Sequence, residues 1–197
     1  LSVSPFHTEF VPFQKVVGLR ESCARVGMGV FLWQERFWRE LSSLDPASTH
    51  SLEEMEERFG PHYRTQLPRR FGLTMRGRAL MYYQKVIVPR PFEAWIEEST
   101  PCSELAATGH FHADLFGKYL PGGCSGLAID LKDLGQPLNE GKYPLLTALY
   151  SEGPAGLYDI ASDYGFQPAP SYASKCHVCT DIRRHLTASS TAHFPEI

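Results

Sequence analysis

The sequence predicts an α/β fold in which a helix crosses between parallel strands. The first 33 residues have the pattern of a strand, a helix and a second strand, and parallel strands need such a crossover. The chain has 197 residues, 43% of them hydrophobic, which is enough to bury a core. Near residue 98 the composition changes, because glycines, histidines and aromatic residues replace the charged helical segments. We therefore predict a layer or barrel of β/α units, followed by a smaller part of different architecture.

The first part begins with a short strand pattern over residues 1–7. A helical pattern follows from about Phe13 to Val26, and residues 29–33 have the pattern of the next strand. Apolar residues recur along the helix at the spacing of a buried face: Val16, Val17, Leu19 and Cys23. We interpret Cys23 as a core residue, since a free cysteine behaves as a small hydrophobic side chain.

The rest of the first part is predicted to include two helices, a strand and a short final helix over residues 92–98. Residues 34–44 have a helical pattern, and Ser51–Glu54 matches a capping box at the start of an acidic helix. Residues 72–80 have the pattern of a strand that runs into a glycine turn, which Arg76 and Arg78 flank. These two arginines either face a ligand at the end of a barrel strand or lie exposed on a loop.

The second part begins with a predicted β-hairpin. Residues 110–116 alternate with the period of a strand, residues 114–117 form the turn, and residues 118–120 return. Three polar side chains share one face of the first strand: His110, His112 and Asp114. They could bind a metal or act as acid and base, or they could simply form hydrogen bonds around the turn.

Three further helices are predicted toward the end of the chain. They cover residues 143–150, 156–164 and 180–186. The first two have apolar faces of leucine, isoleucine and alanine, and the third has Arg183 and Arg184 near its carboxyl end, where the helix dipole favours cations. Residues after Thr187 are mostly Ser, Thr and Ala, and we expect a frayed tail there.

Four of the five cysteines have the arrangement of metal ligands: Cys102, Cys124, Cys176 and Cys179. The last two form a C-x-x-C motif, which we expect on one tight loop, and the glycines around Cys124 allow a sharp ligand turn. Four thiolates suit a structural zinc or one iron–sulfur cluster. If Cys102 is not a ligand, His177 could supply the nitrogen of a zinc site with three cysteines and one histidine. A redox pair is less favoured, because no strand and helix start are predicted around the motif.

Composition also bears on partners and compartment. The net charge of −3 and the pI of about 6.3 give no general attraction to nucleic acid or to an anionic membrane. There is no apolar run of about 18 residues and no secretory signal pattern. The five cysteines are an odd number, which is unlike a disulfide framework. We expect a cytoplasmic protein with no nucleic acid or membrane partner, and there a C-x-x-C favours metal binding.

Four stretches together resemble the carboxyl-terminal half of a radical S-adenosylmethionine (radical SAM) protein. They are residues 4–12, residues 73–79, residues 110–126 and the Lys175–Cys179 motif. The resemblance implies the remaining β/α units of a partial TIM-type barrel over residues 1–98. It implies a small α+β cysteine-bearing extension of the SPASM or twitch kind over residues 99–187. Residues 188–197 are the flexible tail expected from their composition.

The same resemblance implies cofactors and site residues. The four cysteines would hold one auxiliary 4Fe-4S cluster, and the lack of further downstream cysteines is closer to the twitch pattern. Ser4, His7, Arg76 and Arg78 would border the pocket for S-adenosylmethionine and for a peptide or small-molecule substrate. Catalytic residues are not identified.

The sequence departs from the family in one important respect. The C-x3-C-x2-C loop that holds the radical-generating cluster is absent from these 197 residues. We therefore expect a fragment that needs an amino-terminal radical SAM region as its partner, that binds S-adenosylmethionine only with that region, and that is not competent alone. As part of an oxidoreductase or transferase it would contribute the auxiliary cluster. The alternative is a zinc-stabilised binding or structural module, whose ligands are four cysteines or three cysteines and one histidine.

Overall fold

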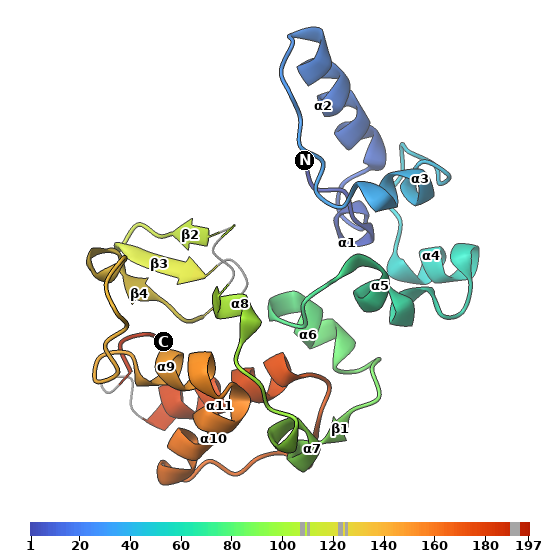
Figure 1. The fold of residues 1–197 in the computed structure, drawn as a ribbon. Coiled ribbons are helices and arrows are strands. Elements are labelled where there is room, and N and C mark those ends of the chain that lie inside the picture. Colours follow the sequence, from blue (N-terminus) through green and yellow to red (C-terminus); the bar gives the residue numbers. More distant parts are fainter. Residues whose placement is uncertain (107–108, 110, 122–123, 125, 190–193) are drawn as a thin grey trace. The chain divides into compact units, whose positions relative to one another are not determined.

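The chain forms two compact units, Leu1–Leu73 and Thr74–Ile197, in a computed structural model. The structure describes residues 1–106, 109, 111–121, 124, 126–189 and 194–197, and Figure 1 shows their elements. The sequence predicted a division near residue 98, whereas the units divide between Leu73 and Thr74. Residues 74–98 therefore belong to the same compact unit as the cysteine-bearing part.

The first unit is mostly helical. Its elements are α1 (Pro5–Thr8), α2 (Phe13–Arg25), the 3-10 helix η1 (Glu35–Phe37), α3 (Trp38–Leu41), α4 (Leu52–Phe59) and α5 (Tyr63–Phe71). The predicted capping box is present, because the Ser51 hydroxyl accepts a hydrogen bond of 3.1 Å from the Glu54 N–H, and the Glu54 carboxylate accepts one of 2.7 Å from the Ser51 N–H. Both bonds satisfy amide groups that a helix start leaves open.

One parallel bridge joins the two segments predicted as the first strands. The N–H of Val3 donates to the carbonyl of Trp33 at 2.9 Å, and the N–H of Trp33 donates to the carbonyl of Leu1 at 2.8 Å. Helix α2 lies between these segments in the sequence, so the β-α-β connection is present over a single bridge. The sheets found among the described residues have two and three antiparallel strands. The partial barrel stays a prediction.

The second unit combines helices with two small sheets. Its elements are α6 (Gly77–Tyr83), β1 (Arg90–Pro91), α7 (Phe92–Glu97), α8 (Ser103–Ala106), β2 (Phe111–Ala113), β3 (Lys118–Pro121), β4 (Ile129–Asp130), the 3-10 helix η2 (Leu131–Asp133), α9 (Pro144–Ser151), α10 (Pro154–Asp163), β5 (Ser171–Tyr172) and α11 (Lys175–Ser189). Strand β1 pairs with β5, and β3 lies between β2 and β4. The predicted hairpin is thus confirmed as β2 and β3.

The core of the second unit lies among α9, α10 and α11, which are neighbours in Figure 1. The leucines predicted to face inward from α9 are buried, and so are Leu157 and Ala161 of α10. From α11 the core receives Val178, Ile182 and Leu186. Cys102, Cys124 and Cys179 pack against this cluster from its edge. The cysteines therefore lie beside a rigid helical core.

Two predicted elements differ from the structure. Residues 72–80 do not form a strand, because α6 begins at Gly77 and continues through Ala79, Leu80 and Met81, which favour helix. Helix α11 begins at Lys175 and not near residue 180. The Ser174 hydroxyl accepts a hydrogen bond of 3.1 Å from the His177 N–H, which is the bond of a helix N-cap.

Of the predicted flexible tail over residues 188–197, residues 190–193 lie outside the described residues, and the last four residues are packed. Phe194 and Glu196 are buried, with exposures of 3% and 1%. The Glu196 carboxylate accepts a hydrogen bond of 2.7 Å from the Leu145 N–H in the first turn of α9, where a negative charge is favourable. Residues 194–197 are therefore part of the packed unit.

None of the helices in the described part of the chain is both long enough and apolar enough to cross a membrane.

Candidate metal centre

The four cysteines predicted as ligands line one small pocket of the second unit. The pocket has a volume of about 40 Å³, whereas one water molecule needs roughly 10–15 Å³. Cys102 lies just before α8, Cys124 lies between β3 and β4, and Cys176 and Cys179 lie in α11. Four charged side chains also line the pocket: Arg76, Glu104, Lys175 and Arg183. Three segments that are distant in the sequence thus contribute cysteines to the lining of one pocket.

Cys176 and Cys179 lie in the first turns of α11, where the sequence predicted a tight loop. Residues three apart on a helix lie on the same face, so both side chains reach the pocket. We disfavoured a redox pair because no strand and helix start were predicted around the motif, but strand β5 does precede α11. A different observation disfavours a reactive pair: the pKa values of the Cys176 and Cys179 thiols are raised, whereas a reactive thiol has a lowered pKa.

The Cys102 segment is held against the junction of α9 and α10. The N–H of Cys102 donates a hydrogen bond of 2.9 Å to the carbonyl of Leu149. The Ser99 hydroxyl donates to the Glu152 carbonyl at 2.7 Å and accepts from the Ala155 N–H at 3.1 Å. At the junction itself, Gly153 has a φ of +72°, and a Cβ atom there would lie 2.0 Å from the carbonyl oxygen of Thr100. Only glycine permits this approach.

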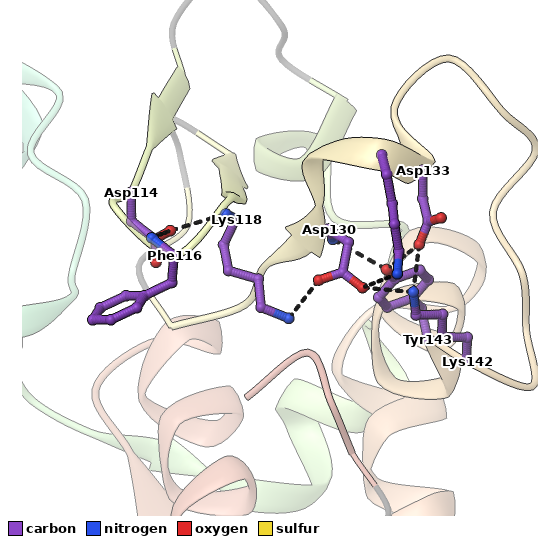
Figure 2. A network of polar contacts seen from close by, with 8 residues as sticks. Asp114, Phe116, Lys118, Asp130, Asp133, Lys142 and Tyr143 are labelled. Atoms are coloured by element: carbon purple, nitrogen blue, oxygen red, sulfur yellow. Dashed lines mark hydrogen bonds and ion pairs between the residues drawn. The ribbon is translucent and has the colours of Figure 1, made fainter.

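Cys124 lies in the connection between β3 and β4, and its N–H donates to the Pro121 carbonyl at 3.0 Å. The base of this connection is held by ion pairs, which Figure 2 shows. The Lys118 ammonium group lies 2.8 Å from the Asp130 carboxylate, and this contact joins β3 to β4. The connection that carries Cys124 therefore starts from two strands that are clamped together.

The same clamp is tied to the start of α9 (Figure 2). The ammonium group of Lys142 lies 2.6 Å from the carboxylates of both Asp130 and Asp133. The Tyr143 hydroxyl donates to the Asp133 carboxylate at 2.5 Å and accepts from the Asp130 N–H at 3.1 Å. Hydrogen bonds from Lys118 and Lys142 lower the pKa of Asp130, and hydrogen bonds from Lys142 and Tyr143 lower that of Asp133. The two carboxylates in turn raise the pKa of Lys142. The small sheet is thereby fixed to the helical core.

Arg183 links the third cysteine-bearing segment to the second. One guanidinium nitrogen, Nη1, donates a hydrogen bond of 2.8 Å to the carbonyl of Gly126, two residues after Cys124. The Arg183 side chain also forms a hydrogen bond with Cys179, one helical turn earlier. Arg183 therefore contacts two of the three segments that carry the cysteines.

Burial controls the ionisation of the thiols in this pocket. It raises the pKa values of Cys124 and Cys176, and it raises the pKa of Cys179 to about 12. The charge of Arg183 acts in the opposite direction on Cys124 and Cys179, but burial is the larger effect. The thiols of Cys124, Cys176 and Cys179 are therefore protonated at neutral pH unless a cation compensates the thiolate charge. A reactive redox pair, in contrast, has a lowered pKa.

The pocket brings the cysteines together without a complete ligand geometry. Over the described residues, no group of three or more His, Cys, Asp or Glu side chains lies close enough to hold a metal ion as it stands. Residues 122–123 and 125, which flank Cys124 and include two of the glycines expected to form its turn, lie outside the described residues.

The nitrogen donor of the alternative zinc site does not line this pocket. The ring of His177 packs edge-on against Tyr172, with 5.0 Å between centroids, and its Nδ1 atom accepts a hydrogen bond of 3.3 Å from the Ala173 N–H. Cys102, which His177 would replace as a ligand, does line the pocket. The fifth cysteine, Cys23, is partly buried on α2 of the first unit.

Of the three polar residues predicted on one face of the hairpin, Asp114 stabilises the turn and does not line the cysteine pocket. One oxygen of its carboxylate accepts hydrogen bonds of 2.9 Å from the N–H groups of Phe116 and Lys118, so it closes the turn (Figure 2). His112 lies on β2, and His110 lies outside the described residues.

The residues expected to border the S-adenosylmethionine pocket fall in different units. In the first unit the Ser4 hydroxyl lies 2.7 Å from Nδ1 of His7, at the start of α1. In the second unit Arg76 lines the cysteine pocket and lies 3.6 Å from the Glu104 carboxylate. Arg78 is exposed on α6.

Sequence reasoning missed Arg183 as part of the site. Its signal was present, because Arg183 follows Cys176 by seven residues and Cys179 by four, a spacing that places all three on one helix face. This spacing is informative only if Cys176 and Cys179 lie on the same helix as Arg183. The sequence predicted that this helix begins near residue 180, after both cysteines, whereas α11 begins at Lys175.

Comparisons of this chain with protein-family models, with curated proteins and with solved structures found no match.

Proposed function

We propose that the second unit holds one auxiliary 4Fe-4S cluster on Cys102, Cys124, Cys176 and Cys179, as part of a radical SAM enzyme. The observation that supports this proposal most directly is the pocket that the four cysteines share. The cysteines that line it come from three segments that are distant in the sequence.

The chemistry of the pocket fits such a group. Four sulfur donors are the usual ligand set of an iron–sulfur cluster. The raised thiol pKa values mean that thiolates in this pocket need positive charge nearby, which a metal centre provides and which Arg183 adds to. When bound, an iron–sulfur cluster supplies one-electron transfer or a site that holds substrate.

Binding would also complete the ligand geometry. A metal site rarely exists fully formed before its metal is present, because thiolates without the cation repel one another. We expect the Cys124 connection to close on the helix-borne pair, since Cys176 and Cys179 are held by α11 and Cys102 is held by α9.

The enzymatic part of the proposal depends on the resemblance to radical SAM proteins. Radical generation would need the C-x3-C-x2-C region as a partner, together with S-adenosylmethionine, and the substrate would be a peptide or a small molecule. Ser4, His7 and Arg78 remain candidates for that pocket, and Arg76 is better supported as a neighbour of the cysteines. A reducing cytoplasm is the proposed compartment, because all five cysteines are free thiols.

Anaerobic reconstitution of the full chain with iron and sulfide tests the proposal. We expect a brown protein with equal amounts of iron and sulfide, and we expect Cys124→Ala and Cys179→Ala to lose most of both. Cys23→Ala is the matched control and should retain the wild-type content, since Cys23 lies in the other unit.

The outcomes separate the two candidate centres. A colourless protein that binds one zinc per chain through the same cysteines would establish a zinc-stabilised module and overturn the cluster. A protein that binds neither metal, or whose metal content is unchanged in the cysteine variants, would overturn the shared centre itself.

A further inference from the structure

We infer that Arg183 is a positioning residue for the proposed centre. Arg183 holds the Cys124 connection against α11, and its charge stabilises the more negative, reduced state of the cluster. This inference rests on the proposed function. It assigns to the Arg183 guanidinium an effect on the reduction potential of the same cluster.

The position of Arg183 follows from helix geometry. Cys176, Cys179 and Arg183 occupy positions i, i+3 and i+7 of α11, so they form one stripe along the helix. Because Ile182 and Leu186 of the same helix are buried in the core, the orientation of this stripe is fixed. The guanidinium group therefore reaches the pocket from a rigid support.

Arg183 approaches the Cys124 connection very closely. The hydrogen bond from Nη1 to the Gly126 carbonyl measures 2.8 Å. A Cβ atom at position 126 would lie only 2.4 Å from the same nitrogen, and Gly126 has a φ of +103°. The chain at Gly126 thus has both the backbone conformation and the open space that this arginine needs.

The charge balance of the pocket gives this contact its effect. Four thiolates carry more negative charge than a cluster core offsets, and reduction adds one further electron. A fixed guanidinium beside the sulfurs favours the reduced state, since charge interactions are strong in a partly buried site. Hydrogen bonds to sulfur and the net charge are established determinants of cluster potential. Arg76, the other arginine in the pocket, lies 3.6 Å from Glu104, which offsets part of its charge.

The experiment compares reduction potentials of the reconstituted full chain. The variants are Arg183→Gln, which removes the charge, and Arg183→Lys, which keeps it. We expect Arg183→Gln to lower the potential by about 59 mV or more, equivalent to a tenfold change in a one-electron equilibrium. Arg183→Lys should recover most of the wild-type potential. Arg184→Gln is the matched control, because Arg184 is an exposed neighbour that does not line the cysteine pocket, and it should leave the potential unchanged.

The outcomes distinguish this inference from the proposed function. If the wild-type chain forms no cluster, the proposed function fails and the inference falls with it. If the wild-type chain forms a cluster but Arg183→Gln keeps its potential, the inference alone is overturned. If Arg183→Gln forms no cluster, the Arg183→Lys variant decides. A cluster in Arg183→Lys with nearly the wild-type potential supports the role of the positive charge. If Arg183→Lys also forms no cluster, the inference is overturned.

Discussion

The N–H of Cys102 donates a hydrogen bond of 2.9 Å to the carbonyl of Leu149, so the first of the four cysteines is attached to the last turn of α9. The attachment depends on the α9–α10 junction, where Gly153 leaves room for the Thr100 carbonyl. A ligand that is distant in the sequence is thus positioned by a glycine that is not a ligand.

Gly153→Ala should destabilise the second unit and reduce its metal content. The new Cβ atom would lie 2.0 Å from the Thr100 carbonyl oxygen. The alanine would also have to adopt a φ of +72° with a ψ of −148°, a conformation almost restricted to glycine, which costs roughly 1–3 kcal/mol. Because the segment that moves carries Cys102, we expect lower iron incorporation together with a lower urea midpoint.

Gly165→Ala is the matched control for that substitution. Gly165 has a similar φ of +77°, but an added Cβ atom would meet nothing within 4 Å. It should therefore show only the backbone cost and keep its iron. Equal iron loss in both variants would contradict the account of the junction.

The clamp at the base of the Cys124 connection predicts how stability depends on pH. Hydrogen bonds from Lys118 and Lys142 lower the pKa of Asp130, and hydrogen bonds from Lys142 and Tyr143 lower that of Asp133. In the unfolded chain these carboxyls titrate near the ordinary value of about 3.9. A lowered folded-state pKa contributes stability that is present above this value and is lost as the pH falls through the folded pKa.

Lys142→Met tests this dependence. The variant should be less stable than the wild type at neutral pH, and the difference should shrink as the pH falls below about 4, where the carboxylates become protonated. Urea midpoints measured over this range give the comparison. Lys132→Met is the control, because its ammonium group is largely exposed and lies 3.9 Å from Asp130, so a small and nearly constant effect is expected. A Lys142→Met deficit that persists undiminished in acid would show that the ion pairs are not its cause.

Ser174→Ala should weaken the start of α11. It removes the hydroxyl that accepts the His177 N–H, and the loss of such a cap costs about 1 kcal/mol. Thermal unfolding of the full chain measures the loss. Ser174→Asp retains an acceptor at this position and should restore the wild-type midpoint, whereas an aspartate variant as unstable as the alanine variant would argue against capping.

The sequence predicted the four cysteines as a set because their identities and spacing carry the signal directly. The helices around the core were predicted well for a similar reason, since the leucines of α9 repeat with helical period and are buried. The hairpin at Asp114 was found from turn chemistry that operates within a few residues.

What the sequence did not predict depends on contacts between distant residues. Ser174 is a cap signal only when the following C-x-x-C is allowed to be helical, and the expectation of a tight ligand loop excluded that. The burial of Phe194 and Glu196 could not be foreseen, because it depends on a hydrogen bond to Leu145, far away in the sequence. The role of Gly153 depends in the same way on the approach of Thr100.

X-ray absorption at the metal edge of the loaded protein identifies the atoms that bind the metal. We expect each bound metal to have only sulfur atoms in its first shell, at about 2.3 Å, as thiolate and sulfide ligands give. We also expect this sulfur shell to be lost in the Cys179→Ala variant. A first shell of nitrogen and oxygen atoms, or a sulfur shell that survives this substitution unchanged, would contradict a centre shared by the four cysteines.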